Sequence, residues 1–261
     1  LCSGIIILLS LFTENIQIPL INWVSKLFNI PMNLKLIKTI GHTDSDFYLN
    51  FFFNPNTMTG KPLFDSVSYD CSRLTTHAYS TSFSLGIRTL GKEIRNPIYA
   101  IYGFVRFADE IVDTFHDYEK HELMARFRKD TVQAIEDRIS LNPILNAFQH
   151  TYHNYNIEWE LVDTFLKSME MDLEKNNYSR EEYDKYILGS AEVVGLMCLR
   201  VFTERNKALY EKLKPYAMKL GAAFQKVNFL RDVKADAETL QRTYFPGVDF
   251  NNFTPAMKQQ I

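Results

Sequence analysis

Residues 102–113 read YGFVRFADEIVD, and this stretch decides the fold class. Most of its side chains are apolar, while Tyr102, Arg106, Asp109 and Asp113 recur at the spacing of one helix face. A helix that is apolar nearly all round is a buried helix. The two carboxylates are therefore predicted to point into the protein interior or a cavity, and not into bulk water.

Two buried carboxylates on one face must be neutralised, because each unpaired charge costs on the order of several kcal/mol once it loses water. Arg106 can neutralise one of the two charges. A divalent cation can neutralise the other. Mg²⁺ is commonly bound beside substrate phosphates by only one or two protein carboxylates. The segment therefore predicts a magnesium site, with Mn²⁺ as the alternative cation.

A second polar stripe lies in residues 221–236, which read GAAFQKVNFLRDVKAD. Gln225, Asn228, Asp232 and Asp236 share one helix face, and apolar residues cover much of the remainder. A lone pair of aspartates on a helix is typical of a solvated face or a salt bridge. Two such stripes, both on apolar helices, instead predict opposing walls of one cavity with metal and diphosphate between them.

The rest of the chain after residue 63 indicates an all-α fold, because no alternating strand pattern competes with the helical spacing. Helices are expected over residues 97–115, 119–139, 158–175, 179–203 and 207–238, with a further helix that begins at Asn142. Their expected boundaries rest on an N-cap followed by proline at Asn96-Pro97 and Asn142-Pro143, a capping box of Ser179 and Glu182, and a bend or break at Pro215.

The composition limits the classes of partner and of compartment. A net charge of −2 implies no bulk attraction to nucleic acid, and three cysteines without metal-like spacing favour a reducing cytosol. Nucleotide-binding glycine motifs do not occur. His150 and His153 could bind metal at their spacing, but a surface pair is the favoured interpretation because no third ligand is near in the sequence.

Residues 1–57 carry no motif, and the domain is expected to occupy residues 58–261. The favoured interpretation is a spurious upstream extension with Met58 as the real start, since residues 41–57 show no sustained period. The alternative is a membrane-surface segment at residues 16–30. The expected location is the cytoplasm, with peripheral membrane association left open for release of an apolar product.

Five segments, in the same order along the chain, resemble motifs of the squalene/phytoene synthase family. They are residues 79–84 (YSTSFS), 102–113, 186–196 (YILGSAEVVGL), 225–236 and 242–246 (RTYFP). The resemblance implies the all-α isoprenoid synthase bundle, with both aspartate motifs facing a central cavity. It also implies that the family's C-terminal helices would follow residue 261.

The resemblance assigns roles by position. Metal binding is implied for Asp109, Asp113, Asn228, Asp232 and Asp236, and Tyr186 matches the active-site tyrosine that would act with the four aspartates. Contact with the substrate diphosphates, or ordering of the site, is implied for Ser80, Ser82, Phe83, Tyr102, Arg106, Gln225 and Arg231. The chain departs from many relatives by Tyr79 in place of histidine, Ala235 in place of an acidic residue, and Glu192 in place of glycine.

The activity implied is head-to-head condensation of two allylic prenyl diphosphates through a cyclopropylcarbinyl diphosphate. Phytoene synthesis from geranylgeranyl diphosphate, without NADPH, is favoured over squalene or dehydrosqualene synthesis from farnesyl diphosphate. A catalytically inactive relative that acts as an assembly factor is the alternative of another class, but all four motif aspartates are present. Gly189, Ala191, Gly195, Gly221 and Ala222 are expected to set the depth of the cavity.

Overall fold

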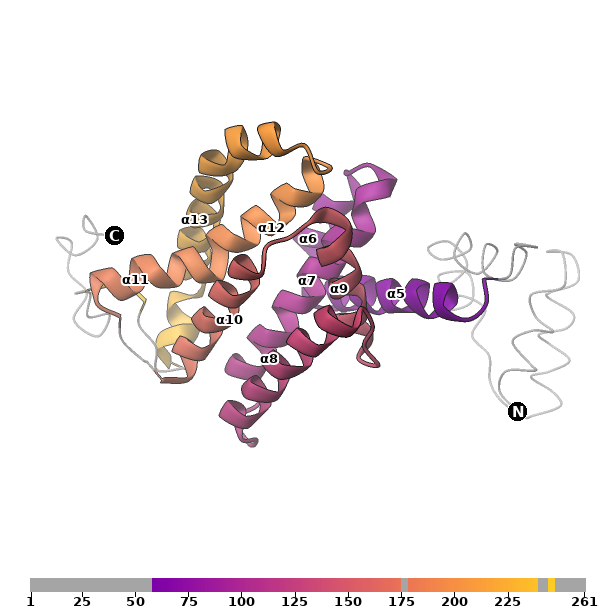
Figure 1. The fold of residues 1–261 in the computed structure, drawn as a ribbon. Helices are drawn as coiled ribbons and strands as arrows, with labels where there is room; N and C mark the ends of the chain where they lie inside the picture. The colour runs from indigo at the N-terminus through magenta and orange to yellow at the C-terminus, as the bar shows by residue number, and fades with distance from the viewer. Residues whose placement is uncertain (1–57, 175–177, 239–243, 247–261) are drawn as a thin grey trace, which may run out of the picture. The chain divides into compact units, whose positions relative to one another are not determined.

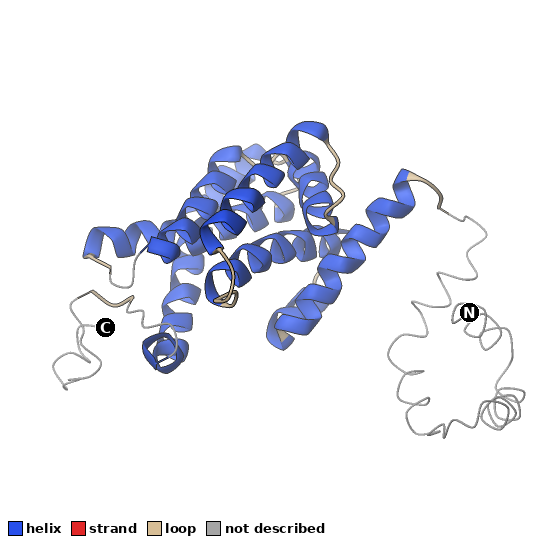
Figure 2. Ribbon diagram, turned by 90° about the horizontal axis from the view of Figure 1, so that it is seen from below, coloured by secondary structure: helices blue, strands red, loops and turns tan. Residues whose placement is uncertain are grey.

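Helices make up nearly all of the chain that the structure describes (Figures 1 and 2). The structure is a computed structural model that describes residues 58–174, 178–238 and 244–246, with side chains placed for all of these except 233–238. No strand occurs in these ranges, so the prediction of an all-α fold is confirmed. The leader expected at residues 1–57 lies outside the described residues.

The helices follow one another through short connections. In chain order they are α5 (Lys61–Tyr79), α6 (Thr81–Arg88), α7 (Lys92–Asp113), α8 (Lys120–Asp137), α9 (Pro143–Tyr155), α10 (Trp159–Glu174), α11 (Arg180–Ile187), the π-helical turn η1 (Leu188–Glu192), α12 (Val193–Phe202) and α13 (Lys207–Glu238). Helix α7 contacts α5, α8, α9, α10 and α12, and thus lies at the centre of the described bundle.

An aromatic cluster around α7 forms the middle of the core. The ring of Phe104 is fully buried and stacks on Phe148 of α9 with ring centroids 3.9 Å apart. Phe127 of α8 and Phe165 of α10 lie 5.6 and 5.5 Å away. Large rings that meet in this way bury much apolar area and fix the angles between four helices at once.

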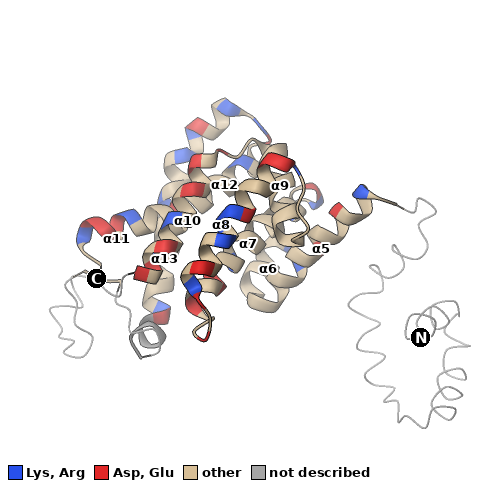
Figure 3. Ribbon diagram, turned by 60° about the horizontal axis from the view of Figure 1, so that its bottom comes forward, with Lys and Arg blue, Asp and Glu red and all other residues tan. Residues whose placement is uncertain are grey.

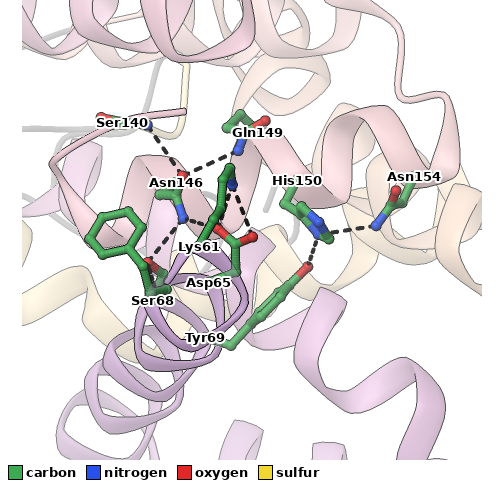
Figure 4. Close-up of polar contacts among 10 residues, drawn as sticks. Lys61, Asp65, Ser68, Tyr69, Ser140, Asn146, Gln149, His150 and Asn154 are labelled. Atoms are coloured by element: carbon green, nitrogen blue, oxygen red, sulfur yellow. Dashed lines mark hydrogen bonds and ion pairs between the residues drawn. The ribbon is translucent and has the colours of Figure 1, made fainter. Parts of the chain in front are cut away.

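Buried hydrogen bonds attach α5 to α9 (Figure 4). The amide Nδ2 of Asn146 donates to Asp65 Oδ1 at 2.9 Å and to Ser68 Oγ at 3.1 Å. The Oδ1 atom of Asn146 accepts from the backbone N–H of Ser140 at 3.2 Å. A fully buried amide must be satisfied in this way, and the network sets the register of α5 against α9.

Ion pairs join α8 to α10 at the bundle surface. Arg128 Nη1 lies 2.5 Å from Asp163 Oδ1, and its Nε lies 2.7 Å from Glu170 Oε1. Figure 3 shows acidic and basic residues interspersed over the outer helix surfaces. Among the described helices, none has the length and hydropathy needed to cross a bilayer.

Two of the three predicted helix starts are confirmed and one is wrong. Asn142 caps α9 by accepting from the N–H of Ile144 at 3.0 Å, and the capping box at the start of α11 is present. Helix α7, however, begins at Lys92, five residues before Pro97. Arg95 donates to the carbonyl of Leu90 at 2.9 Å, which stabilises the connection before α7 and lets the helix start early.

The predicted helix over residues 179–203 is divided into α11, η1 and α12, because one π-helical turn interrupts it. Helix α13 runs through Pro215 without a break, and in Figure 1 its first turns run in a different direction from the rest. The predicted bend is therefore present and the predicted interruption is not.

One glycine of η1 and one of α13 serve close helix packing. A Cβ atom at Gly189 would lie 2.5 Å from Ser168 Cβ and 2.9 Å from the carbonyl of Thr164 on α10. A Cβ atom at Gly221 would lie 2.7 Å from the carbonyl of Ala191. Both positions face neighbouring backbone, so the expectation that these two glycines set the depth of a cavity is wrong.

Candidate active site

The carboxylates of α7 surround the guanidinium of Arg106. Its Nη1 donates to Asp109 Oδ2 at 2.6 Å, and its Nε donates to Glu110 Oε2 at 3.0 Å. The helical spacing of three and four residues makes these contacts possible, because such positions lie one above the other on the same face. One arginine thus holds two acidic side chains, and Asp113 lies one further turn along.

The charged form of Asp109 is disfavoured although Arg106 contacts it. The pKa of Asp109 is raised to about 7, first by burial and then by the nearby charge of Asp113, while Arg106 opposes the rise. A carboxyl with such a pKa disfavours its charged form until a positive charge arrives. The site is therefore suited to receive a cation.

The α5–α6 junction brings the predicted diphosphate-binding residues to this end of α7. The guanidinium of Arg106 lies over the ring of Tyr79, 4.5 Å from its centroid. Phe83 and Tyr102 lie with ring centroids 5.3 Å apart. Ser80 caps α6 by accepting from the N–H of Phe83 at 3.2 Å. Residues from 79–84 and 102–109, which are separate in sequence, therefore form one cluster.

Ser82 also belongs to this cluster, because its hydroxyl lies 3.4 Å from that of Ser80. Its side chain and that of Phe83 are exposed, with Phe83 at 58%. An open group of hydroxyls next to a guanidinium can accept an anionic substrate without first breaking a buried contact.

The second polar stripe lies on one side of α13. Asn228 donates to Gln225 at 3.4 Å, and Asp232 accepts from its own neighbour Arg231 at 2.8 and 2.6 Å. Asp232 is 41% exposed. The side chain of Asp236 lies outside the described residues.

The apolar side of α13 differs from the expectation of a buried helix. Phe224, Val227 and Leu230 are 64%, 60% and 54% exposed, and no described residue covers them. Phe229 is buried and packs against Tyr186. The polar stripe and Phe229 thus face the bundle, which leaves the opposite, apolar side outward.

Sequence reasoning missed Asp172 of α10. It is 6% exposed and accepts from Tyr178 at 2.5 Å, Tyr186 at 2.6 Å and Tyr244 at 3.3 Å. Its charge also raises the pKa of Asp109, so the two carboxyl groups are electrostatically coupled. The available signal was its place on the apolar face of α10, three residues after the buried Met169.

The residues present fit a magnesium ion that is shared with substrate. Among the placed side chains, no three His, Cys, Asp or Glu residues gather into a metal-holding group. Mg²⁺ beside phosphates does not need three, because one or two carboxylates and the phosphate oxygens complete its octahedron together with water. Asp109 and Asp113 would supply that pair on α7.

The histidine pair and a surface cleft at the other end of α7 lie apart from this site. His150 contacts the hydroxyl of Tyr69 at 3.0 Å (Figure 4), while His153 contacts the carbonyl of Ile135 at 2.9 Å, so the two rings serve packing. A cleft of about 470 Å³ is lined by Tyr69, Glu93, Ile94, Asn96, Pro97 and Arg205 among others. Its α7 residues lie about 20 Å along the helix from Asp109.

The charge of Glu192, which stands where many relatives have glycine, is partly balanced by a lysine of α13. Burial raises the pKa of Glu192, and the positive charge of Lys226 on α13 opposes the rise. The half-buried carboxyl therefore interacts with a facing lysine.

Comparison with known proteins identifies relatives with these motifs. A sequence profile named squalene/phytoene synthase matches residues 76–257. Phytoene synthase 1 of Solanum lycopersicum is 30% identical over 185 residues, which cover 69% of this chain and 44% of that protein. The 4,4'-diapophytoene synthase of Staphylococcus haemolyticus is 27% identical over 196 residues, covering 70% of this chain and 64% of that protein.

Solved structures agree with the fold. A dehydrosqualene synthase in complex with ligand superposes with a TM-score of 0.64 at 25% identity, covering 75% of this chain and 67% of that one. The squalene synthase HpnC from Alicyclobacillus acidocaldarius superposes with a TM-score of 0.62 at 21% identity, covering 71% of this chain and 68% of that one.

The chain spans 44% of the tomato protein and 64% of the staphylococcal one. The profile nevertheless covers most of this chain, and the aspartate, tyrosine and serine motifs all fall within it. By its sequence and its all-helical fold, the chain belongs to the squalene/phytoene synthase family.

Proposed function

We propose that this chain carries the active site of a Mg²⁺-dependent prenyltransferase that joins two allylic prenyl diphosphates head to head. The observation that carries the proposal is the cluster formed by Arg106, Asp109 and the α5–α6 junction, in a member of this family. A guanidinium beside a carboxylate that lacks a second cation is suited to a metal–diphosphate complex.

Each end of the site has a separate task. Asp109 and Asp113 would hold Mg²⁺ on one side, and Asn228, Asp232 and Asp236 would do so on the other. When bound, the metal neutralises the diphosphate and makes it a better leaving group. Arg106 and Ser80 would orient the same diphosphate by charge-assisted and neutral hydrogen bonds.

The aromatic residues near Asp172 suit the carbocations that such a reaction passes through. Phe229 and Tyr244 stack with ring centroids 4.3 Å apart, and Tyr186 lies 5.0 Å from Tyr244. Aromatic faces stabilise cations through their quadrupole, and apolar walls keep out water that would trap them. The coupling then proceeds through a cyclopropylcarbinyl diphosphate, which ionises again and rearranges.

Phytoene is the proposed product and geranylgeranyl diphosphate the proposed substrate. The phytoene synthase names of several relatives support this choice, and NADPH is not required for a product that ends in proton loss. The diapophytoene and presqualene diphosphate synthases among the relatives support the alternative, in which farnesyl diphosphate is coupled.

Product analysis tests the proposal. The full chain is incubated with geranylgeranyl or farnesyl diphosphate, with and without Mg²⁺ and NADPH, and the products are identified by mass spectrometry. Phytoene from geranylgeranyl diphosphate and Mg²⁺ alone is expected. Strict preference for farnesyl diphosphate would replace phytoene synthesis with the alternative, and no coupled product from either substrate would overturn the proposed function.

We also propose a cytoplasmic location with peripheral membrane contact, because a hydrocarbon product favours a lipid phase. Sedimentation with lipid vesicles tests this contact when the full chain is compared with a variant lacking residues 1–57.

A further inference from the structure

Asp172 is a buried carboxylate that belongs to neither aspartate motif. Tyr178 donates to its Oδ1 atom at 2.5 Å, and Tyr186 donates to its Oδ2 atom at 2.6 Å. Tyr244 adds a longer bond to Oδ1 at 3.3 Å. Charge-assisted hydrogen bonds of this length are strong, so the carboxylate and the three hydroxyl groups are held in a fixed arrangement.

The surroundings of this group separate it from the polar end of the site. The rings of Tyr178 and Tyr244 stack at 5.3 Å, and Phe229 stacks on Tyr244. Tyr186 is 4% exposed. The carboxylate thus lies behind an aromatic surface, where a proton that reaches it is shielded from bulk water.

The proposed coupling requires a group with these properties. One substrate loses diphosphate, and its C1 atom bonds to the double bond of the second substrate. Closure of the cyclopropane ring then breaks a C–H bond at C1 of the first substrate, the carbon that has just bonded to the double bond, and that proton must be accepted in a site from which water is excluded. Either the released diphosphate or a protein group accepts it.

We propose that Tyr186 and Asp172 form a proton relay that accepts the proton lost on ring closure, an inference that rests on the proposed function. The electron pair of the broken C–H bond closes the ring, and the proton bonds to Tyr186 Oη. The original hydroxyl proton of Tyr186 moves to Asp172 Oδ2 along the 2.6 Å hydrogen bond. Asp172 becomes a neutral acid and returns the proton to solvent when products leave.

In this scheme Tyr186 touches the substrate and is the catalytic residue, while Asp172 positions it and takes up its proton. Tyr178 bonds to the other carboxylate oxygen and lies outside the relay. This asymmetry provides a matched control, because Tyr178→Phe removes one hydrogen bond from the same carboxylate without interrupting the path.

The test compares Asp172→Asn and Tyr186→Phe with Tyr178→Phe in the full chain. We expect the first two variants to lower formation of the cyclopropyl intermediate by about 10²–10⁴-fold, the usual contribution of acid–base catalysis. Tyr178→Phe should lower it by less than about tenfold, the order of one lost hydrogen bond. KM for the prenyl diphosphate should change little in all three, because the diphosphate binds elsewhere.

Two readouts separate proton transfer from a purely structural role. The amount of diphosphate released per cyclopropyl intermediate should rise in Asp172→Asn and Tyr186→Phe, because the coupled cation that cannot lose a proton adds water and becomes a coupled alcohol instead of closing the ring. The isotope effect with substrate deuterated at C1 should also increase, because proton transfer becomes rate-limiting.

The outcomes are decisive in each direction. Equal loss in Tyr178→Phe and Tyr186→Phe, or an unchanged isotope effect and diphosphate ratio in Asp172→Asn, would overturn the relay and leave the diphosphate as the base. If Asp172→Asn has a much lower melting temperature than the unaltered chain, the relay is tested by comparing Tyr186→Phe with Tyr178→Phe alone. If the unaltered chain couples neither substrate, the proposed function itself fails.

Discussion

The guanidinium of Arg106 lies over the ring of Tyr79, 4.5 Å from its centroid, while the same group donates to Asp109 at 2.6 Å. The arginine is therefore fixed from two directions, by an aromatic face and by a carboxylate. Tyr79 stands where many relatives have histidine, and its ring provides an orienting contact that needs no proton. Tyr79 can therefore hold Arg106 in place at the position where many relatives have histidine.

Replacing Arg106 by lysine should impair catalysis although the charge is kept. Lysine cannot make the planar, forked contacts to Asp109 and Glu110, so the ammonium loses its fixed position. We expect kcat/KM to fall on the order of 10²-fold. Steady-state kinetics check this, with Arg126→Lys on the exposed side of α8 as a control that should retain normal turnover.

Replacing Tyr79 should reveal whether its ring or its hydroxyl matters. Tyr79→Phe should behave as the unaltered enzyme, since the ring face contacts the guanidinium. Tyr79→Ala should raise KM about two- to fivefold, in line with ~0.5–1 kcal/mol for an exposed cation–π contact. A Tyr79→Phe variant as weak as Tyr79→Ala would show that the hydroxyl binds substrate directly.

The stability of the metal-free protein should fall as the pH rises from about 4 to 7. The folded state holds the proton of Asp109 up to a pKa of about 7, whereas the pKa of a free aspartate is 3.8. Ionisation within this range therefore costs folding free energy. Asp109 is 35% exposed, so screening limits the loss to roughly 1–2 kcal/mol.

Denaturant titrations with a chelator present measure this loss. Asp109→Asn should flatten the pH profile and be the more stable protein at pH 7. Asp117→Asn, in the exposed loop after α7, should follow the unaltered profile. Parallel profiles for Asp109→Asn and the unaltered protein would show that the pH dependence does not come from Asp109.

Mg²⁺ and inorganic diphosphate together should raise the melting temperature far more than the sum of their separate effects. Each alone leaves an unbalanced charge, whereas the complex is neutralised by the aspartates and Arg106. Asp232→Asn should reduce this synergy without changing the metal-free melting temperature, because its exposed carboxylate bonds only weakly in water. Purely additive shifts would indicate two unrelated binding sites.

Gly189→Ala should destabilise the fold by about 1–3 kcal/mol, the usual cost of overpacking. The new methyl group would meet Ser168 and the backbone carbonyl of Thr164. Gly86→Ala is the matched control, because nothing lies within 4 Å of its Cβ position and alanine favours helix. Thermal melts check both, and equal melting temperatures would show that α10 can move aside.

The helical fold and the α7 cluster could be predicted because their information is local. A period of 3.6 residues, the capping box at Ser179 and the stripe through Arg106, Asp109 and Asp113 all lie within single helices. The predicted start at Asn96-Pro97 is wrong because a competing local contact, from the side chain of Arg95 to the carbonyl of Leu90, stabilises an earlier start.

The Asp172 cluster could not be predicted in the same way. Its hydroxyl donors lie 6, 14 and 72 residues further along the chain, and only the fold brings them to one carboxylate. For α13 the sequence indicates which residues share a face, but not which face turns inward. Exposed Phe224 and buried Phe229 are equally apolar, so packing alone distinguishes them.

The π-helical turn at Leu188–Glu192 has a consequence for how the chain tolerates insertions and deletions. A π turn holds one residue more than an α turn, and one residue rotates an α-helix by about 100°. Tyr186 before the turn and Met197 after it are both buried. Deleting a single residue here would convert the π turn into an α turn and leave Arg180–Ile187 and Val193–Phe202 in phase, whereas the same deletion within either α-helical half would rotate the rest of that half away from its neighbours.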